Sequence, residues 1–447
     1  MKNNSKKVAL HNLGCKVNSY ETDAMTKLLE ENGYEIVSFE PGADIYIINT
    51  CTVTNIADRK SRQMLHKAKK MNPDAVVVAV GCYVQAAGEE LKKDDAIDII
   101  VGNNRKHSIV DVLNNYYESK EADSIIDIAH DNTYEEAFCI NESNDHMRAF
   151  IKIQDGCNQF CSYCIIPYAR GRVRSRKMED MIEEVTTLAN RGFKEIVLTG
   201  IHLSSYGKDF KEDNVGLLDA IISCTKINGI ERIRLGSLEP GIITREFVER
   251  LSRERKFCPH FHLSLQSGCD DTLLRMNRKY TAEEYYEKCS IIREYFPDAA
   301  ITTDVIVGFP QETEEEFEKT KEFLEKVDFA EMHIFKYSKR NGTKAAIMTG
   351  QVDDRIKTQR SNILIELGNR MHKDFLKKFI DKKIEILIEE KIVVNNKEYY
   401  TGYTKEYVKV IIETNDLEDM NNTIITVVGK KTMVDERTNE EILLAEI

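Results

Sequence analysis

The sequence of 447 residues lacks a long hydrophobic run. Its longest apolar stretch, residues 75–80, is far shorter than a membrane span requires. The first residues lead directly into a strand pattern and contain no apolar core of the kind that a signal peptide has. We therefore expect a cytoplasmic protein with no membrane partner.

The sequence also lacks an excess of positive charge. Its net charge of −12 argues against a surface coated for nucleic acid, although it leaves room for a local basic site. Basic residues gather in two stretches, 59–70 with six Lys or Arg and 170–177 with five. Such a stretch is usually a solvated helix face or loop. The second stretch follows a cysteine motif, which favours a functional role for its arginines.

Eleven cysteines without an export signal indicate a reducing compartment, where clustered thiols serve as metal ligands or catalysts. Cys157, Cys161 and Cys164 stand at C-x3-C-x2-C spacing, which lets them close around one metal centre. A structural zinc site needs four ligands, yet the next histidine is only His202. The spacing therefore favours an iron–sulfur cluster that keeps one iron open, with a zinc knuckle as the alternative.

Three further cysteines follow three strand patterns in the N-terminal part. The predicted strands are residues 7–13, 44–50 and 75–80, and helices from about Ser19 and over 58–71 separate them. Strands that alternate with helices predict a parallel sheet, whose carboxyl ends share one edge. Cys15, Cys51 and Cys82 should therefore converge there as a second metal site. Three separately buried cysteines are the alternative.

A second α/β pattern begins at residue 148 and predicts a partial barrel of six strand–helix units. Its expected strands are residues 150–154, 195–198, 232–235, 260–265, 301–307 and 329–335. Helices are expected at 180–190, 282–295 and 314–327. Cys157 follows the first strand, at the end of the barrel where such folds place their chemistry.

The remaining segments are connections and a small β-rich module. Residues 114–146 are polar and acidic and are expected to connect the two α/β parts. After a helical pattern at 355–379, short strands at 384–388, 399–401, 407–412 and 423–428 predict a small β-barrel. The aromatic residues of 402–410 are suited to stacking on bases, and Lys405 and Lys409 to phosphates. Packing on the barrel surface is the alternative for any one of them.

The other cysteines carry no assigned chemistry. Cys224, Cys258 and Cys289 are expected to be packing residues, and Cys139 has no partner in the sequence pattern. Cys269 follows a predicted strand on the active edge and stays ambiguous.

These motifs resemble the methylthiotransferase branch of the radical S-adenosylmethionine (SAM) enzymes. The resemblance rests on the run from Cys157 to Arg176, on LGCKVN at 13–18, NTCTV at 49–53 and VGC at 80–82. It implies an α/β chain with an open parallel sheet domain at 5–117, a radical SAM barrel at 143–372 and a TRAM-like RNA-binding β-barrel at 375–440. It further implies two [4Fe–4S] clusters. Cys157, Cys161 and Cys164 would hold the cluster whose open iron binds SAM, and Cys15, Cys51 and Cys82 the auxiliary cluster.

Within that family, GCKVN at 14–18 and CSYCIIP at 161–167 look most like the branch acting on threonylcarbamoyladenosine. That likeness implies a transferase that methylthiolates C2 of this nucleoside at tRNA position 37, with SAM as radical source and methyl donor. The arginine-rich segment fits both RNA and the threonyl carboxylate. Isopentenyladenosine in tRNA and an aspartate of a ribosomal protein are alternative substrates, and a non-catalytic iron–sulfur RNA-binding protein is the rival class. An electron donor of the flavodoxin or ferredoxin type is implied, and the sulfur source stays open.

Overall fold

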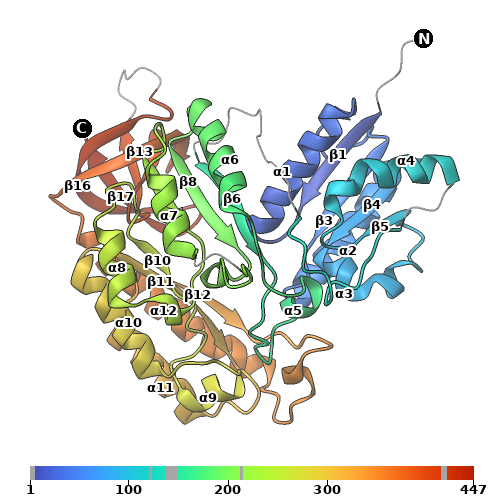
Figure 1. The fold of residues 1–447 in the computed structure, drawn as a ribbon. Helices are drawn as coiled ribbons and strands as arrows, with labels where there is room; N and C mark the ends of the chain where they lie inside the picture. The colour runs from blue at the N-terminus through green and yellow to red at the C-terminus, as the bar shows by residue number, and fades with distance from the viewer. Residues whose placement is uncertain (1–5, 120–122, 136–147, 212–214, 414–419) are drawn as a thin grey trace.

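The computed structural model describes residues 6–119, 123–135, 148–211, 215–413 and 420–447. Three parts follow one another along the chain: an open parallel sheet with helices on both faces, a curved array of six parallel strands, and a closed β-barrel (Figure 1). Within these described ranges, no helix is both long and apolar enough to cross a membrane.

The N-terminal part is a five-stranded parallel sheet in the order β2-β1-β3-β4-β5. Its strands are β1 Lys7–Asn12, β2 Glu35–Ile36, β3 Ile45–Thr50, β4 Val76–Gly81 and β5 Ile99–Val101. Its helices are α1 Lys16–Glu31, α2 Asn55–Met71, α3 Cys82–Leu91, η1 Lys106–Ser108 and α4 Ile109–Ser119. Every residue of β3 and β4 is buried, as expected of strands covered on both faces.

The three strands predicted in this part are confirmed, and one prediction is wrong. Residues 114–119 do not begin a connection but continue α4, whose Val112 and Leu113 pack on the sheet. The short strands β2 and β5 were not predicted, because two or three residues give no readable period. Residues 123–135 run along the sheet and the central part, and residues 136–146 of the expected connection lie outside the described chain.

The central part contains all six predicted strands in parallel. They are β6 Arg148–Asp155, β8 Glu195–Gly200, β9 Arg232–Leu235, β10 His260–His262, β11 Ala300–Val307 and β12 Glu331–Lys336. The short β7 Arg174–Ser175 pairs antiparallel with β6, and isolated bridges join the β9 and β10 regions. β10 is shorter than expected; after it, Leu263 still donates to the Thr302 carbonyl at 2.9 Å and forms an isolated bridge with Leu238.

The helices of the central part are α5 Ile166–Ala169, α6 Met178–Asn190, α7 Leu217–Thr225, α8 Arg245–Ser252, α9 Asp270–Arg275, α10 Ala282–Tyr295, α11 Glu314–Val327 and α12 Asp354–Lys377, with η2 Leu203–Ser205, η3 Pro240–Ile242 and η4 Lys344–Ile347. Helices α6, α7, α8, α10, α11 and α12 cover the outer face of this strand array, and the short α5 contacts α3 of the N-terminal part. α10 and α11 have the bounds that the sequence predicts, and Thr281 and Thr313 fix their starts because each forms a capping box.

The C-terminal part is a closed barrel in the order β13-β14-β15-β17-β16. Its strands are β13 Lys383–Val394, β14 Lys397–Thr404, β15 Lys409–Glu413, β16 Ile424–Asp435 and β17 Glu440–Glu446. β17 was not predicted, because its sequence EEILLAE is poor in residues that favour strands. The barrel nevertheless pairs β17 with both β15 and β16.

This barrel packs against the amino ends of the central strands (Figure 1). Arg232 donates to the Tyr403 carbonyl at 2.6 Å, and Arg234 donates to the Lys405 carbonyl at 3.1 Å. Tyr403 and Tyr407 stack on each other at 4.6 Å between ring centroids, and Arg148 lies over both rings. The packing alternative is therefore confirmed for these tyrosines, whose faces are not free to stack on bases.

A buried ion network joins the N-terminal sheet to the central part. Glu21 on α1 accepts from Lys152 of β6 at 2.8 Å and from Arg170 at 2.8 and 3.0 Å, and it also pairs with Lys106. Burial opposes ionisation, but Arg170, Lys106 and Lys152 hold the pKa of Glu21 well below its usual range. Asp155 completes the network with Lys152 at 2.7 Å and Arg170 at 3.2 Å.

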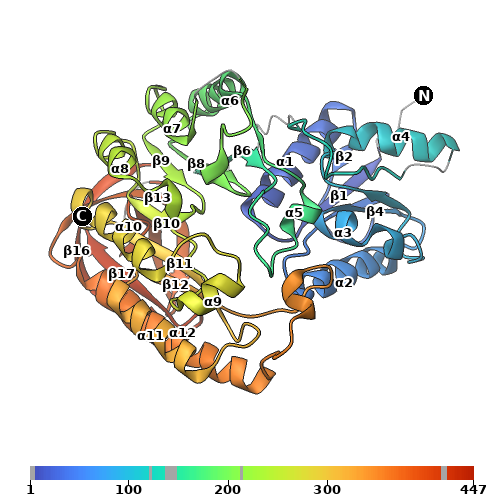
Figure 2. The same ribbon diagram turned by 60° about the horizontal axis from the view of Figure 1, so that its bottom comes forward.

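A second contact joins the N-terminal part to the loop after β12, at the margin of the strand array opposite β6. Arg340, in the loop after β12, pairs with Asp58 of α2 at 2.5 Å, and Asn55 donates to the Lys339 carbonyl at 2.9 Å. Figure 2 shows this loop beside α2. The N-terminal sheet thus contacts both margins of the curved strand array and lies across its open side.

We expect Phe379→Ala to destabilise the protein by about 3–5 kcal/mol. Phe379 is buried between α12 and β13, in a cluster that joins Ala300 and Ala330 of the central part to the barrel. The change should lower the apparent melting temperature of the metal-free protein, measured by circular dichroism. Leu274→Ala is the control, because that side chain is 77% exposed. Equal melting temperatures for both variants would show that the barrel is not packed as described.

We expect Glu21→Gln to cost about 3–5 kcal/mol, because it leaves buried cations without their shared carboxylate. Thermal unfolding of the metal-free variant measures the loss. Glu30→Gln is the matched control on the same helix, since Glu30 is exposed. A Glu21→Gln protein as stable as the control would contradict the role of the network at this interface.

Candidate metal centres

The three N-terminal cysteines lie at one edge of the sheet. Cys15 follows β1, while Cys51 and Cys82 come directly after β3 and β4, and these strands are adjacent and parallel. Burial raises the pKa of Cys51 to about 11, and the neighbouring thiols of Cys82 and Cys15 add to the rise. Gly14, at φ 109°, lets the chain pass Cys51, whose Sγ would lie 2.9 Å from an added Cβ. The structure therefore brings the three cysteines together at this edge, and their role as a metal site stays a prediction.

Polar side chains form hydrogen bonds with this thiol set and with the backbone beside it. Asn103 donates to the Cys82 sulfur at 3.3 Å, and Arg170 donates to the same sulfur through Nε at 3.2 Å. Asn18 binds the Leu13 and Thr50 carbonyls and accepts from Arg170 at 2.6 Å. The sequence analysis missed Asn103, because a single Asn after a strand carries no distinguishing pattern.

The second thiol set lies on the loop after β6. Burial raises the pKa of Cys157 to about 11 and that of Cys164 to about 12, and the Cys161 thiol contributes to both shifts. Arg278 donates to the Cys161 sulfur at 3.3 Å and is itself held by Glu239 at 2.7 and 2.9 Å. The loop can turn here because residue 156 is glycine. A Cβ at this position would lie 1.8 Å from the Arg172 carbonyl oxygen.

The spread of the sulfur atoms distinguishes a cluster from a single ion. In neither set do all three sulfur atoms lie within 4.8 Å of one another, although all six cysteines belong to the described chain. One tetrahedral zinc would draw its thiolates to roughly 3.8 Å apart, given Zn–S bonds of about 2.3 Å. Three thiols that converge more loosely, without a fourth protein ligand, fit a multi-iron cluster.

The arginine-rich stretch does not have the role expected from the sequence. Arg170, Arg174 and Arg176 are almost fully buried and pair with Glu21, Asp155 and Glu184. Arg172 is exposed and lies over the Phe160 ring at 4.7 Å. The prediction that this segment meets RNA and a substrate carboxylate is therefore wrong for its three buried arginines, which hold the protein's own carboxylates.

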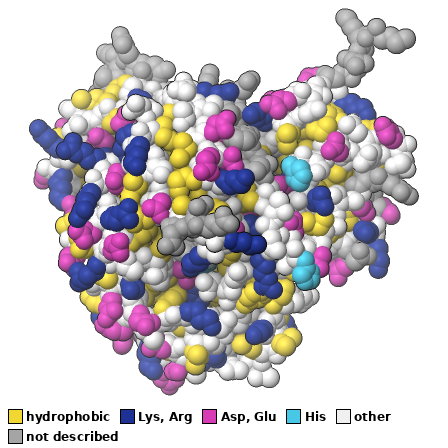
Figure 3. All heavy atoms as spheres, in the orientation of Figure 1, with side chains coloured by type: hydrophobic (Ala, Val, Ile, Leu, Met, Phe, Trp, Pro, Cys, Tyr) yellow, Lys and Arg dark blue, Asp and Glu magenta, His cyan; other side chains and the backbone are white. Residues whose placement is uncertain are grey.

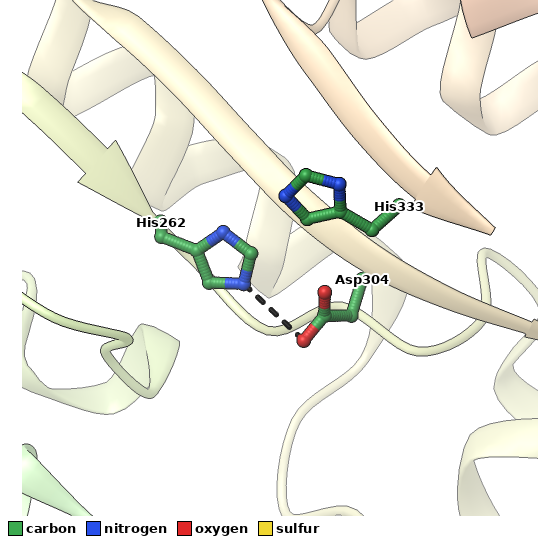
Figure 4. Close-up of side chains that lie close together, drawn as sticks. All are labelled: His262, Asp304 and His333. Carbon is green, nitrogen blue, oxygen red and sulfur yellow. Dashed lines mark ion pairs between the residues drawn. The ribbon is translucent and has the colours of Figure 1, made fainter. Parts of the chain in front are cut away.

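The inner face of the curved strand array is polar. Strand residues alternate between two faces, and the outer positions pack with the helices. The inner positions of three neighbouring strands carry His262, Asp304 and His333 (Figure 4). His262 approaches Asp304 at 3.3 Å through Nε2 and Thr302 at 2.9 Å through Nδ1, while its ring stacks on His333.

Lys16 points toward this interior from the N-terminal sheet. It is exposed, directly follows Cys15, and its ammonium lies 5.6 Å from the ring of Phe150 on β6. Although part of the side chain is exposed, desolvation by the surrounding protein lowers the pKa of Lys16; Arg148 and Arg234 lower it further, and Glu195 raises it. Lys16 and the polar side chains of β10, β11 and β12 thus face the same side of the strand array.

The other cysteines have separate surroundings. Cys224, Cys258 and Cys289 are fully buried, which confirms them as packing residues. Cys269 is buried near Asp271 and Glu316, and Glu316 pairs with Arg275. Cys139 lies outside the described residues.

Comparison with known proteins shows which families and proteins this chain is similar to. Residues 7–102 match the family described as "Uncharacterized protein family UPF0004", and residues 151–324 match the Radical SAM superfamily. The chain is 42% identical over 94% of its length to Threonylcarbamoyladenosine tRNA methylthiotransferase MtaB of Bacillus subtilis (strain 168), covering 93% of that protein. It is 38% identical over 89% of its length to tRNA-2-methylthio-N(6)-dimethylallyladenosine synthase of Acetivibrio thermocellus, covering 83% of it.

A solved structure shares the fold over most of the chain at low identity. The radical SAM methyltransferase TsrM from Kitasatospora setae superposes with a TM-score of 0.55 at 16% identity, covering 77% of this chain and 75% of that one. The sequence relatives are similar over most of their length and contain both matched regions. The chain therefore belongs to the radical SAM methylthiotransferase family.

Proposed function

We propose that this protein methylthiolates C2 of N6-threonylcarbamoyladenosine at position 37 of tRNA. The observation that carries the proposal is the pair of thiol sets on facing edges of two α/β parts, linked by Arg170. This residue lies six positions after Cys164 yet donates to the Cys82 sulfur. A reaction that joins sulfur to an unactivated carbon needs both sets near one substrate atom. The 42% identity to the Bacillus subtilis enzyme supports this choice of nucleoside.

Each thiol set is assigned one cofactor. When bound, a [4Fe–4S] cluster at Cys157, Cys161 and Cys164 supplies a radical from SAM, and a second at Cys15, Cys51 and Cys82 supplies sulfur. The chain's own residues orient both sets. Arg278 and Arg170 each donate an N–H to a ligand sulfur, and such hydrogen bonds tune the potential of an iron–sulfur centre.

The tRNA needs cations at the surface, because phosphates dominate the affinity for nucleic acid. Acidic and basic side chains intermingle on the face shown in Figure 3, as the net charge leads one to expect. Helix α2 exposes Arg59, Lys60, Arg62, Lys67 and Lys70 beside the edge that carries Cys51. We assign phosphate contacts to this helix, in addition to the C-terminal barrel.

A second substrate is supported by one observation. Relatives named for dimethylallyladenosine in tRNA reach 38–40% identity, close to the values of the threonylcarbamoyl group of relatives. Nucleoside mass spectrometry of tRNA, from cells with and without this chain, separates the two substrates. Unchanged 2-methylthio nucleosides in both strains would instead point to a ribosomal protein or to a non-catalytic role.

We expect Cys157, Cys161 and Cys164, replaced together by Ala, to leave about half of the iron, because one of two four-iron sites remains. Formation of 5′-deoxyadenosine from SAM under anaerobic reduction should disappear. Iron content and deoxyadenosine are measured on the same preparation. Deoxyadenosine from this variant, or a complete loss of iron from a folded protein, would contradict two separate centres.

We expect the triple replacement Cys15→Ala, Cys51→Ala and Cys82→Ala to have the complementary effect. Deoxyadenosine formation should continue, because the loop after β6 keeps its three thiols. The thiomethyl nucleoside should fall below detection, because the site of sulfur supply is gone. Normal product from this variant would contradict the assignment of sulfur supply to these three cysteines and leave them as packing residues.

A further inference from the structure

The threonylcarbamoyl group carries a carboxylate, which needs a cationic partner in a site that excludes water. The buried arginines of 170–176 are not available, because they hold Glu21, Asp155 and Glu184. We infer that Lys16 binds this carboxylate and thereby selects the substrate. The inference rests on the proposed function and assigns one residue within its site.

Lys16 differs from the cations around it in having no counterion. Lys152 and Arg170 share Glu21, Arg148 pairs with Glu389 at 2.9 Å, and Arg234 pairs with Glu195 at 2.9 Å. Among the described residues, no carboxylate lies within ion-pair distance of Lys16 and none accepts a hydrogen bond from it. The side chain of Lys16 is exposed, and its ammonium lies 5.6 Å from the ring of Phe150 on the inner face of β6. A cation without a counterion of its own is suited to an anionic ligand.

The charge around Lys16 favours an anion. Burial lowers the pKa of His260 well below its usual range, and Arg234, His262, Lys16 and His333 lower it further. Arg234, His262, Lys16 and His333 therefore all lie near the imidazole of His260. Glu195 raises the pKa of Lys16 but is paired with Arg234 at 2.9 Å, and Asp304 lies 3.3 Å from His262. Lys16 thus adds a positive charge beside the ion pairs Arg234–Glu195 and Arg148–Glu389, which favours an anionic ligand there.

The opposite wall offers groups for the rest of the substituent. The threonylcarbamoyl group also has a hydroxyl and N–H donors, and Asp304 and His333 present an acceptor and an imidazole to the interior (Figure 4). Two imidazoles and a carboxylate could also hold a divalent cation. His260 lies on the same strand as His262, and Lys16 and Arg234 are close to His260. Their positive charge opposes a divalent cation at His262.

The position of Lys16 also links recognition to chemistry. It is the next residue after Cys15, so its backbone belongs to the edge that carries the N-terminal thiol set. N6 is attached to C6 of the adenine, and only N1 separates C6 from C2 in the six-membered ring. Anchoring the substituent at Lys16 therefore holds C2 near the sulfur-supplying edge.

The test uses the full-length protein with both clusters and two synthetic anticodon stem–loops. One carries threonylcarbamoyladenosine, and the other carries the same nucleoside with its carboxylate replaced by a carboxamide. We expect Lys16→Gln to lower kcat/KM for the acid about 10- to 100-fold, as for the loss of a charged hydrogen bond. The carboxamide should be a poor substrate for the natural protein, and Lys16→Gln should lower its kcat/KM no further.

Two variants and two readouts separate binding from folding. Lys16→Arg should restore part of the activity on the acid, because it restores the charge. Lys27→Gln is the matched control on the same helix, where Lys27 makes only an exposed ion pair with Glu31. Iron content and melting temperature should match in all variants.

Three outcomes overturn the inference. Equal losses on both stem–loops would make Lys16 a structural residue, and no loss on the acid would exclude it from the site. If the natural protein made no product from either stem–loop, the proposed function itself would fail, and the assignment of Lys16 with it.

Discussion

The architecture depends on one buried carboxylate. Glu21 belongs to α1 of the N-terminal sheet, but two of its three cationic partners, Lys152 and Arg170, belong to the central part. Removing any partner from such a network leaves a buried charge uncompensated, so the two parts have one favourable arrangement. Because Arg170 also binds Cys82 and Asn18, the same contacts that join the parts set the relation between the two thiol sets. Arg170 therefore both joins the two parts and contacts the N-terminal thiol set.

Much of the fold follows from periodicity in the sequence. Six strand patterns predicted the six parallel strands of the central part, and cysteines at successive strand ends predicted their convergence at one edge. Both inferences use local spacing together with the rule that parallel strands end on the same side. They need no knowledge of which segments meet in space.

The ion network could not be predicted in this way. Glu21 lies 85, 131 and 149 residues from its partners Lys106, Lys152 and Arg170, and on a helical pattern it reads as an ordinary surface acid. The same limit explains the arginine stretch. Sequence shows a run of alternating positive charge, but only packing shows that Arg174 and Arg176 turn inward to carboxylates. Likewise, nothing local in the barrel segment indicates that Tyr403 and Tyr407 pack under Arg148.

The polar inner face of the strand array distinguishes this fold from a closed barrel. A closed (β/α)8 barrel fills its interior with branched aliphatic side chains, and its loops alone carry the chemistry. Here the inner positions hold charged and imidazole groups, which cannot close into an apolar core and must face water, one another or a ligand. The N-terminal sheet lies over the open side and adds Cys15 and Lys16 to that interior. In the proposed function, the central part holds the radical centre, while the covering sheet holds the sulfur site and the charge that selects a substrate. Substrate preference within such a family can then change at the covering edge, without altering the strands that hold the radical centre.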